Sequence, residues 1–203
     1  MNHLKKLSRL KNRYFVMRHG QSMANLQGLI VSTAENGVSS YGLSNTGKQQ
    51  VRESVLASQL LDSDSISDIQ IISSDFKRAR ETAEIAAKIL KTKQAVFLDS
   101  KLRERNFGDL ELTSDKNYQK TWADDAINSS HTNNNVESAD AVMQRVTSLL
   151  VTLEEQYTAR IFLLVAHGDT LQILQTAFKK QPASKQRELV HLETAEIREL
   201  TLC

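Results

Sequence analysis

The chain is poor in several residue types that define specialised protein classes. Cysteine and proline occur once each, as Cys203 and Pro182, and glycine occurs seven times in 203 residues. A single cysteine can form neither an internal disulfide nor a thiolate metal site, and a single proline excludes a proline-rich linker. No apolar run approaches the ~18 residues that a membrane-spanning helix needs. Disulfide-stapled, collagen-like and membrane-spanning chains are therefore excluded.

An excess of one charge is also missing. Lys and Arg total 26 and Asp and Glu total 24, which gives a net charge of +2. A nucleic-acid binder with a dedicated basic face usually has a stronger excess. Hydrophobic residues make up 40% and charged residues 25%, close to a soluble globular average. We expect one domain over residues 1–203, with no nucleic-acid or membrane partner.

The first residues are basic but do not match a secretory signal. Leucines at positions 4, 7 and 10 alternate with Lys and Arg, and the next apolar run, residues 14–17, already ends at Arg18. A signal peptide needs an apolar region of ~7–15 residues after its charges. A membrane-surface helix is disfavoured because the segment is short and weakly apolar. We interpret it as a short basic leader of a cytoplasmic protein.

Short apolar runs alternate with helical patterns along the chain. Apolar residues with helical spacing follow Gly47 and recur in residues 76–90, 142–153 and 171–178. Strands are expected at residues 14–17, 69–72, 95–98 and 161–165, with weaker candidates at 190–192 and 197–202. The alternation predicts an α/β fold with a mostly parallel sheet covered by helices on both faces.

Residues 113–135 interrupt this alternation. The segment is polar, yet Tyr118, Trp122 and Ala126 follow a spacing of four residues. It predicts a short helix on a loop excursion above the sheet, and such insertions often act as lids. A helix that only packs against the domain is an equally good interpretation.

Two His-Gly pairs each follow a predicted strand. His19-Gly20 comes after residues 14–17, and His167-Gly168 comes after residues 161–165. Ligands of open α/β sheets bind at the carboxyl ends of the strands, so the two histidines are expected to meet there. A single histidine in this place could merely cap its strand, but the repeated pattern favours a shared site.

Two arginines belong to the same predicted edge. Arg18 precedes His19, and Arg78 falls in the first turn of the helix that follows Ser73-Ser74-Asp75. Helix N-termini bind anions, and the planar guanidinium matches phosphate oxygens. Alone, Arg78 would be interpreted as a solvated charge. Together with the histidines, the arginines predict a pocket for a dianion such as phosphate.

These residues lie in a series of blocks that resembles the histidine phosphatase superfamily, the clan of the cofactor-dependent phosphoglycerate mutases. The blocks occur in the family's order, from about residue 14 to 170. They are Arg18-His19-Gly20-Gln21-Ser22 with Asn25, residues 43–47, residues 74–83, residues 102–108, Glu137-Ser138 with Arg145, and Val165-Ala166-His167-Gly168. Each block is weak alone, but the ordered set is specific.

The resemblance implies a role for each matching residue. His19 would be the nucleophile that becomes a phosphohistidine, and Glu104 would protonate the leaving group. The phosphoryl group would be bound by Arg18, Asn25, Arg78, Gly168 and His167, of which His167 also counts as catalytic. No metal or cofactor is implied, because the cationic side chains supply the charge. The alternative role for Glu104 is an ion pair with Arg103 or Arg105.

The spacing of the acid and the second histidine bears on the reaction. Only 62 residues lie between Glu104 and His167, whereas the resembling mutases typically carry a longer insertion there. A shorter insertion lets water reach the phosphohistidine. We therefore expect a phosphatase that acts on a small phosphorylated metabolite. A mutase of the same clan and a non-catalytic phospho-ligand binder are the alternatives.

Some segments depart from the family pattern. The acid block ends in Leu110-Glu111-Leu112, where the family usually has glycine at the last position, and residues 32–40 are expected to form an extended polar loop. These departures leave the substrate contacts open.

Two competing patterns are weaker. Residues 42–49 nearly match a P-loop, but Gln49 replaces the metal-binding Ser or Thr, and Ser44 is expected to cap a helix instead. A zinc site would need a third ligand near His19 and His167. His3, His131 and His191 are scattered and are interpreted as surface or packing residues.

Overall fold

A computed structural model describes residues 1–58, 60 and 68–203. Its sheet has the strand order β3-β2-β4-β1-β5. β1 and β2 pair in parallel with β4, β3 pairs in parallel with β2, and β5 pairs antiparallel with β1. The strands are β1 (Arg13–Arg18), β2 (Gln70–Ser73), β3 (Phe97–Leu98), β4 (Ile161–Ala166) and β5 (Ile197–Leu200). The predicted mostly parallel sheet is confirmed.

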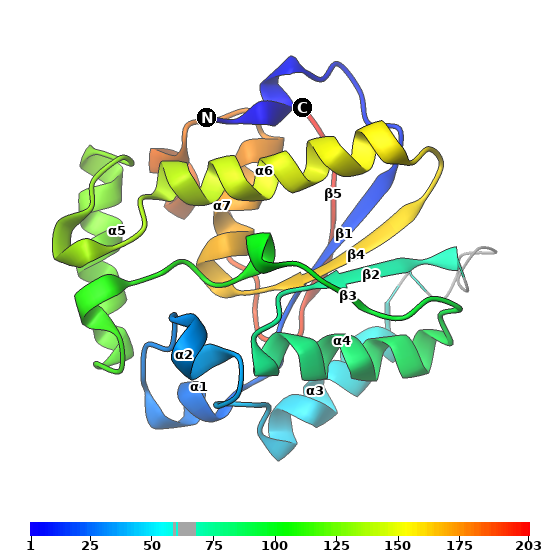
Figure 1. Cartoon of the computed structure of the whole chain (residues 1–203), viewed down its shortest axis with the longest axis horizontal. Coiled ribbons are helices and arrows are strands. Elements are labelled where there is room, and N and C mark those ends of the chain that lie inside the picture. Colours follow the sequence, from blue (N-terminus) through cyan, green and yellow to red (C-terminus); the bar gives the residue numbers. More distant parts are fainter. Residues whose placement is uncertain (59, 61–67) are drawn as a thin grey trace.

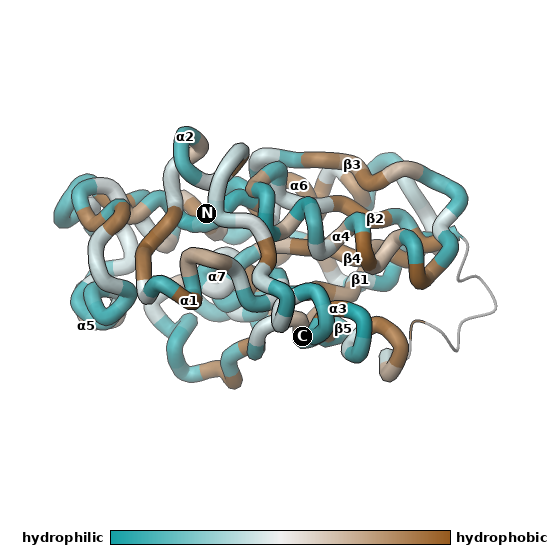
Figure 2. Tube along the Cα trace, turned by 90° about the horizontal axis from the view of Figure 1, so that it is seen from below, coloured by the Kyte–Doolittle hydropathy of each residue, from teal (hydrophilic) through white to brown (hydrophobic). Residues whose placement is uncertain are grey.

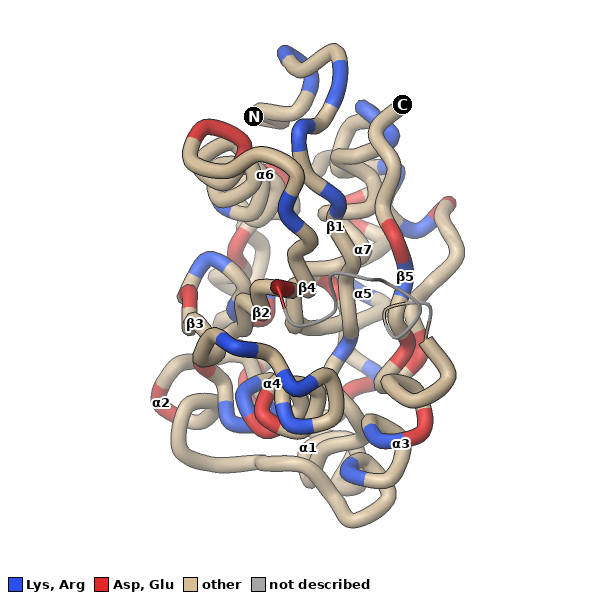
Figure 3. The backbone as a smooth tube through the Cα atoms, turned by 90° about the vertical axis from the view of Figure 1, so that its right-hand side faces the viewer, with Lys and Arg blue, Asp and Glu red and all other residues tan. Residues whose placement is uncertain are grey.

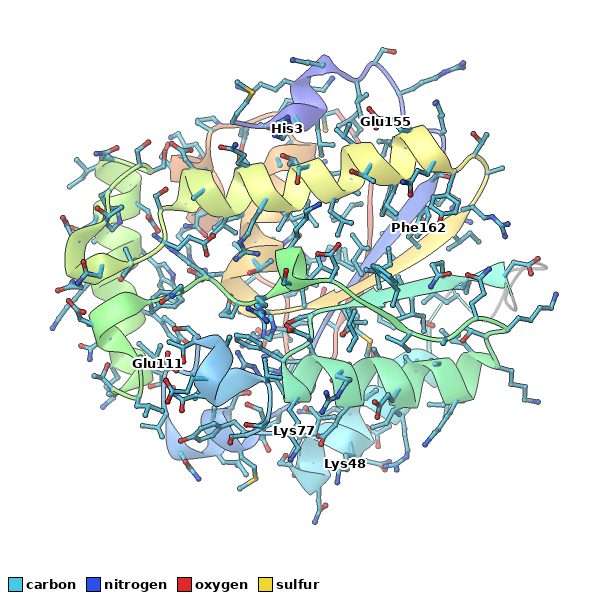
Figure 4. The ribbon with its side chains drawn as sticks, viewed as in Figure 1. His3, Lys48, Lys77, Glu111, Glu155 and Phe162 are labelled. Atoms are coloured by element: carbon cyan, nitrogen blue, oxygen red, sulfur yellow. The ribbon has the colours of Figure 1, made fainter. Side chains whose placement is uncertain are left out.

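Helices cover both faces of the sheet, as Figure 1 shows. Alternate residues of a strand point to opposite faces. Tyr14 and Val16 of β1 pack with α6 (Ala139–Gln156) and α7 (Gly168–Phe178), whereas Phe15 and Met17 pack with α3 (Asn45–Leu56) and α4 (Lys77–Leu90). Much of the strand trace is hydrophobic in Figure 2, and Phe162, labelled in Figure 4, lies between α6 and the strands. Charges of both signs occur on α4 (Figure 3).

The start of α3 brings a loop close to the end of β1. Ser44 caps the helix by accepting from the Gly47 N–H at 2.9 Å, as predicted. A Cβ built at Gly20 would lie 2.5 Å from the carbonyl oxygen of Gly47, and one at Gly47 would lie 2.0 Å from the carbonyl oxygen of Gln21. Only glycine permits this close approach. Residues 42–47 therefore support the His19-Gly20 turn instead of forming a P-loop.

Three further helices gather at the end of the sheet where β1, β2 and β4 finish (Figure 1). They are α1 (Met23–Gln27), α2 (Ala34–Gly37) and α5 (Tyr118–Ile127). The helix predicted around Tyr118 and Trp122 is thus confirmed. The prediction of an extended loop over residues 32–40 is wrong, because α2 forms there. Thr33 caps α2, and Glu111, labelled in Figure 4, accepts from Ser32, Thr33 and Asn36.

The remaining turns of helix are short. They are 3-10 helices at His3–Lys6, Ser100–Leu102, Gly108–Leu110, Asp115–Asn117, Asn133–Asn135 and Ala183–Glu188. The first of them shows that the N-terminal segment is part of the fold. Leu4 is fully buried, and Asn2 donates to the carbonyl of Ala177. Within the described ranges, no helix combines the length and apolar character needed to cross a membrane.

Of the two weaker strand predictions, the one at residues 190–192 is wrong and the one at residues 197–202 is confirmed. Residues 190–192 have no strand structure, because the backbone of Val190 and His191 is bound by the Arg198 side chain instead of a neighbouring strand. Residues 197–202 do supply a strand, β5. The expected strand at 95–98 shrinks to Phe97–Leu98 at the sheet edge, where both side chains are exposed.

Candidate functional site

A cavity of about 370 Å³ opens at the carboxyl ends of the strands. Arg18 ends β1 and His19 follows it, Arg78 comes from the first turn of α4, and Gly168 begins α7 after β4. The structure brings all of the predicted site residues except His167 into the cavity wall, including Asn25 and Glu104. His167 lies directly behind the wall, with its ring centroid 5.1 Å from that of His19.

His19 is held as a neutral imidazole. Its Nδ1 lies 2.8 Å from the carbonyl oxygen of Gly20, and because a carbonyl only accepts, Nδ1 carries the ring proton. Burial, reinforced by the charges of Arg78 and Arg18, holds the pKa of His19 well below its ordinary value. The Nε2 lone pair accepts from Arg78 Nε at 3.1 Å. Nε2 is therefore the ring atom with the available lone pair, and it faces the Arg78 guanidinium.

Several buried nitrogen atoms around His19 have no hydrogen-bond acceptor among the described residues. Among the described residues, no partner contacts the buried atoms Arg18 Nε, Arg78 Nη1 and His167 Nδ1. Arg78 is otherwise fixed, since its Nη2 donates to the carbonyl of Val31 at 2.8 Å. Buried donors without partners are costly, so such a group of them indicates a place for an anion.

His167 is held behind the cavity wall by a hydrogen bond between its ring and Ser74. Its Nε2 lies 2.9 Å from Ser74 Oγ, which itself accepts from the Phe76 N–H. The tautomer with the ring proton on Nδ1 lets the Ser74 hydroxyl donate to Nε2, and Nδ1 then offers a donor that has no partner among the described residues. Burial, followed by the charge of Arg78, lowers the pKa of His167 well below its ordinary value.

Asn25 and Gly168 line the cavity in different ways. The Asn25 Oδ1 accepts from the Ser22 N–H and Oγ in a capping box, so only its amide nitrogen can face a ligand. Gly168 is the first residue of α7, where free N–H groups favour an anion. The arrangement fits both residues to phosphate oxygens.

Glu104 forms no ion pair with the residues that the structure describes. Arg103 binds Asp75 and Arg105 binds Asp125, both through two nitrogens. The alternative role considered for Glu104 is therefore wrong. Its Oε1 accepts from the Arg105 N–H at 3.0 Å and from the Thr170 N–H at 3.3 Å.

The electrostatics of Glu104 favour a protonated acid. Burial raises the pKa of this carboxyl, and the neighbouring Asp169 carboxylate raises the pKa further. The carboxyl is 8% exposed and lines the cavity beside Arg78 and Gly168. A protonated carboxyl beside a phosphate pocket can supply the proton that a leaving group needs.

The segment that carries Glu104 is braced from α6. Arg145 donates to the carbonyl of Glu104 at 3.3 Å and to the carbonyl of Lys101 at 2.5 Å. Glu137 fixes Arg145 in turn at 2.8 Å. Glu137 and Arg145 therefore position the segment of Glu104, and Ser138 caps α6, although none of these residues lines the cavity.

The insertion forms the far wall of the cavity. Trp122 of α5 donates through Nε1 to both carboxylate oxygens of Asp169 at 3.0 Å. The guanidinium of Arg187 lies 3.7 Å from the Trp122 ring centroid, and Tyr118 stacks on Trp122 with centroids 5.5 Å apart. Residues 113–135 therefore contribute side chains to the site as well as packing against the domain.

His191 is a cavity residue that the sequence did not indicate. Its interpretation as a surface or packing residue is wrong, since Nε2 lies 2.7 Å from Arg18 Nη1. The residue lies in an irregular segment between the Ala183–Glu188 helix and β5, outside every motif. No pattern in the sequence could have identified it.

The other two histidines keep their structural interpretation. His131 is buried against Asp125 at 3.0 Å, and His3 is half-buried, with its backbone N–H on Thr147. In the ranges that the structure describes, no three His, Cys, Asp or Glu side chains are grouped to hold a metal ion.

Comparisons with known proteins agree with this geometry. The model of the histidine phosphatase superfamily (branch 1) matches residues 14–202. The chain is 31% identical over 183 residues to a protein of Photorhabdus laumondii named probable phosphoglycerate mutase GpmB, covering 86% of this chain and 78% of that protein. It is 29% identical over 182 residues to phosphoglycerate mutase-like protein 4 of Arabidopsis thaliana, with 86% and 74% covered.

Solved structures share the fold. A mycobacterial glucosyl-3-phosphoglycerate phosphatase in complex with VO3 superposes with a TM-score of 0.76 at 24% identity, covering 96% of this chain and 93% of that one. Bacillus stearothermophilus YhfR gives a TM-score of 0.73 at 21% identity, with 93% and 90% covered. At these identities the superpositions establish the architecture alone.

Proposed function

Since the chain belongs to the histidine phosphatase superfamily, we propose that it is a metal-independent phosphomonoester hydrolase acting on a small phosphorylated metabolite. The observation that carries this proposal is the state of His19. Its Nε2 lone pair lies among donors from Arg18, Arg78 and His167 that lack partners in the described part of the chain. That arrangement suits in-line attack on a phosphoryl group.

In the first step the Nε2 atom of His19 attacks phosphorus. A P–N bond forms while the bond from phosphorus to the substrate oxygen breaks. Glu104 gives its proton to that oxygen, so the leaving group departs as a neutral alcohol. Arg18, Arg78 and His167 donate to the phosphoryl oxygens and stabilise the charge of the transition state.

In the second step water hydrolyses the phosphohistidine. The Glu104 carboxylate takes a proton from the water as its oxygen attacks phosphorus, and the P–N bond breaks. Inorganic phosphate leaves, and His19 and Glu104 return to their starting protonation states. We propose residues 113–135, with Trp122 and Tyr118, as the lid over this reaction.

A mutase is the second candidate. It is favoured by the 31% identical relative named probable phosphoglycerate mutase. A mutase would return the phosphoryl group from His19 to a bound substrate hydroxyl instead of to water. The 62 residues between Glu104 and His167 form a shorter insertion than the resembling mutases carry, which supports hydrolysis.

A panel of phosphorylated metabolites that includes 3-phosphoglycerate tests the proposal. Release of inorganic phosphate with EDTA present is expected for at least one compound. Conversion of 3-phosphoglycerate to its isomer without phosphate release would make the protein a mutase. Activity that is lost in EDTA and restored by a divalent metal would contradict the metal-independent mechanism. No turnover of any compound, including an activated aryl phosphate, would indicate a binding protein.

A further inference from the structure

Arg18 is held between two segments that are far apart in the sequence. Its Nη1 donates to the carbonyl of Leu192 at 2.9 Å and lies 2.7 Å from His191 Nε2. On the other side, a Cβ built at Gly168 would lie 3.6 Å from the Arg18 Cζ, so the guanidinium rests against the first turn of α7. Arg18 Nε and His191 Nδ1 are both buried without a partner among the described residues, and both are left for a ligand.

The contact with Arg18 fixes the state of the His191 ring. A guanidinium only donates hydrogen bonds, so His191 Nε2 must accept. The ring is therefore neutral and carries its proton on Nδ1. Burial, with the positive charge of Arg18 next in importance, lowers the pKa of His191 to about 4. His191 thus acts as an acceptor at neutral pH.

The segment around His191 is itself anchored. Arg198 of β5 donates to the carbonyls of Val190 and His191 at 2.8 and 3.1 Å. Gln172 of α7 donates to the carbonyl of Leu189 at 2.9 Å. The ring of His191 is consequently presented to Arg18 from a fixed backbone.

We infer that His191 is a positioning residue for phosphoryl binding: its neutral ring accepts from Arg18 Nη1 and turns the partnerless Nε–H toward the phosphoryl oxygens. The inference rests on the proposed function, since it concerns the same site. Without His191, Nη1 keeps only the carbonyl of Leu192, and the guanidinium can rotate about that contact. A hydrogen bond to a charged group is worth enough to change phosphate affinity by about tenfold.

Titration calorimetry with inorganic phosphate at pH 7 tests this role. His191→Leu removes the acceptor and is expected to weaken phosphate binding by about tenfold. His191→Gln offers an amide oxygen to Arg18 and is expected to restore most of the affinity. His3→Leu, a half-buried histidine outside the cavity, is the matched control and should leave the affinity unchanged. Equal affinity of His191→Leu and the wild type would overturn the inference.

A double-mutant cycle with Arg18→Gln shows whether His191 acts through Arg18. His191→Leu is expected to have no further effect on phosphate affinity once Arg18 has been replaced. An undiminished effect in that background would overturn the positioning role and make His191 a direct ligand contact. Binding requires no chemical step, so these results are separate from turnover. A wild type that binds phosphate but hydrolyses no ester would count against the proposed function alone.

Discussion

The cavity has two halves that differ in how their polar groups are hydrogen-bonded. The strand side is formed by residues at the ends of β1 and β4 and the start of α4, and the insertion side by α5 and the residues packed against it. On the strand side, Arg18, Arg78 and His167 each have a buried nitrogen without a partner among the described residues. On the insertion side, charged groups satisfy one another: Trp122 donates to Asp169, and Asp125 binds Arg105 and His131. The donors of the strand side are placed for an anion, whereas the carboxylates of the insertion side already have partners.

The difference separates reactive groups from supporting groups. A buried donor without a partner costs ~1–3 kcal/mol, which a bound anion offsets. A buried pair such as Arg105 and Asp125, at 2.6 and 2.8 Å, has no capacity left for a ligand. Changes on the strand side should therefore affect catalysis, and changes on the insertion side should mainly affect stability and access.

Removal of the nucleophile should have the largest effect. His19→Ala is expected to lower kcat by at least ~10⁴-fold, because the residues of a covalent mechanism act as a unit. His19 lies in the cavity wall, so the folded structure should persist. Turnover of an aryl phosphate measures the loss of kcat, and thermal unfolding measures whether the fold persists. His3→Ala is the control for both measurements. A near-normal kcat in His19→Ala would show that His19 is not the nucleophile and would contradict a catalytic role for the strand side.

The next effect depends on the leaving group. Glu104→Gln keeps the size of the side chain but removes its transferable proton. It should slow an alkyl phosphate by ~10²–10⁴-fold and a nitrophenyl phosphate by clearly less, because the latter expels a weak base. Equal slowing of both substrates would show that Glu104 serves binding or structure, and Asp169 would be the next candidate for the acid.

The pH profile sharpens the assignment of Glu104. Burial raises the pKa of this carboxyl, so the protonated form persists above the pH at which an ordinary Glu ionises. Alkyl phosphate turnover is expected to fall as pH rises through the raised pKa. The pH–rate profile of Glu104→Gln should lack this descending limb. An unchanged limb in the variant would assign it to another group.

A change on the insertion side should be moderate and structural. Trp122→Phe removes the donor that binds Asp169 and should lower the free energy of unfolding by ~1–3 kcal/mol. Phosphate affinity should change little, since the donors of the strand side are untouched. Tyr157→Phe, at an exposed residue, is the control and should be neutral. A large loss of phosphate affinity in Trp122→Phe would show that the insertion side also binds phosphate, which would contradict the distinction between the two halves.

The smallest expected effect concerns the turn that leads into the insertion. Leu112 has φ 59°, in the left-handed region that favours glycine, and its side chain is 45% exposed. Leu112→Gly should raise the free energy of unfolding by about 0.5 kcal/mol. The matched change Leu26→Gly, at an exposed position within α1, should lower it by about 1 kcal/mol. Destabilisation by both changes would show that Leu112 is not strained.

The sequence predicted the strand side well for a physical reason. Strand ends, His-Gly pairs and helix N-termini are local features, and parallel strands bring their carboxyl ends together. His19 and Arg78 are therefore found in one cavity, and Glu104, which only the family resemblance indicated, lies there with them. Leu112 stands where the family usually has glycine, and its backbone adopts the left-handed conformation that favours glycine.

The insertion side depends on contacts between distant segments. His191 meets Arg18 across 173 positions, and Trp122 meets Asp169 across 47. The helix α2 formed in a polar segment because Glu111, 75 to 79 residues away, satisfies its first turn. No local periodicity reports such pairs, so the sequence predicted the helix around Tyr118 and Trp122 but not the contacts of this side of the cavity.

Capture of the covalent intermediate tests the central claim most directly. The protein would be mixed with an aryl phosphate, quenched in base during the first turnover, digested, and mapped by mass spectrometry. The mechanism predicts a phosphoryl group on His19 that is stable in base and labile in acid. A phosphoryl group on any other residue, or steady turnover without a phosphoenzyme, would contradict it.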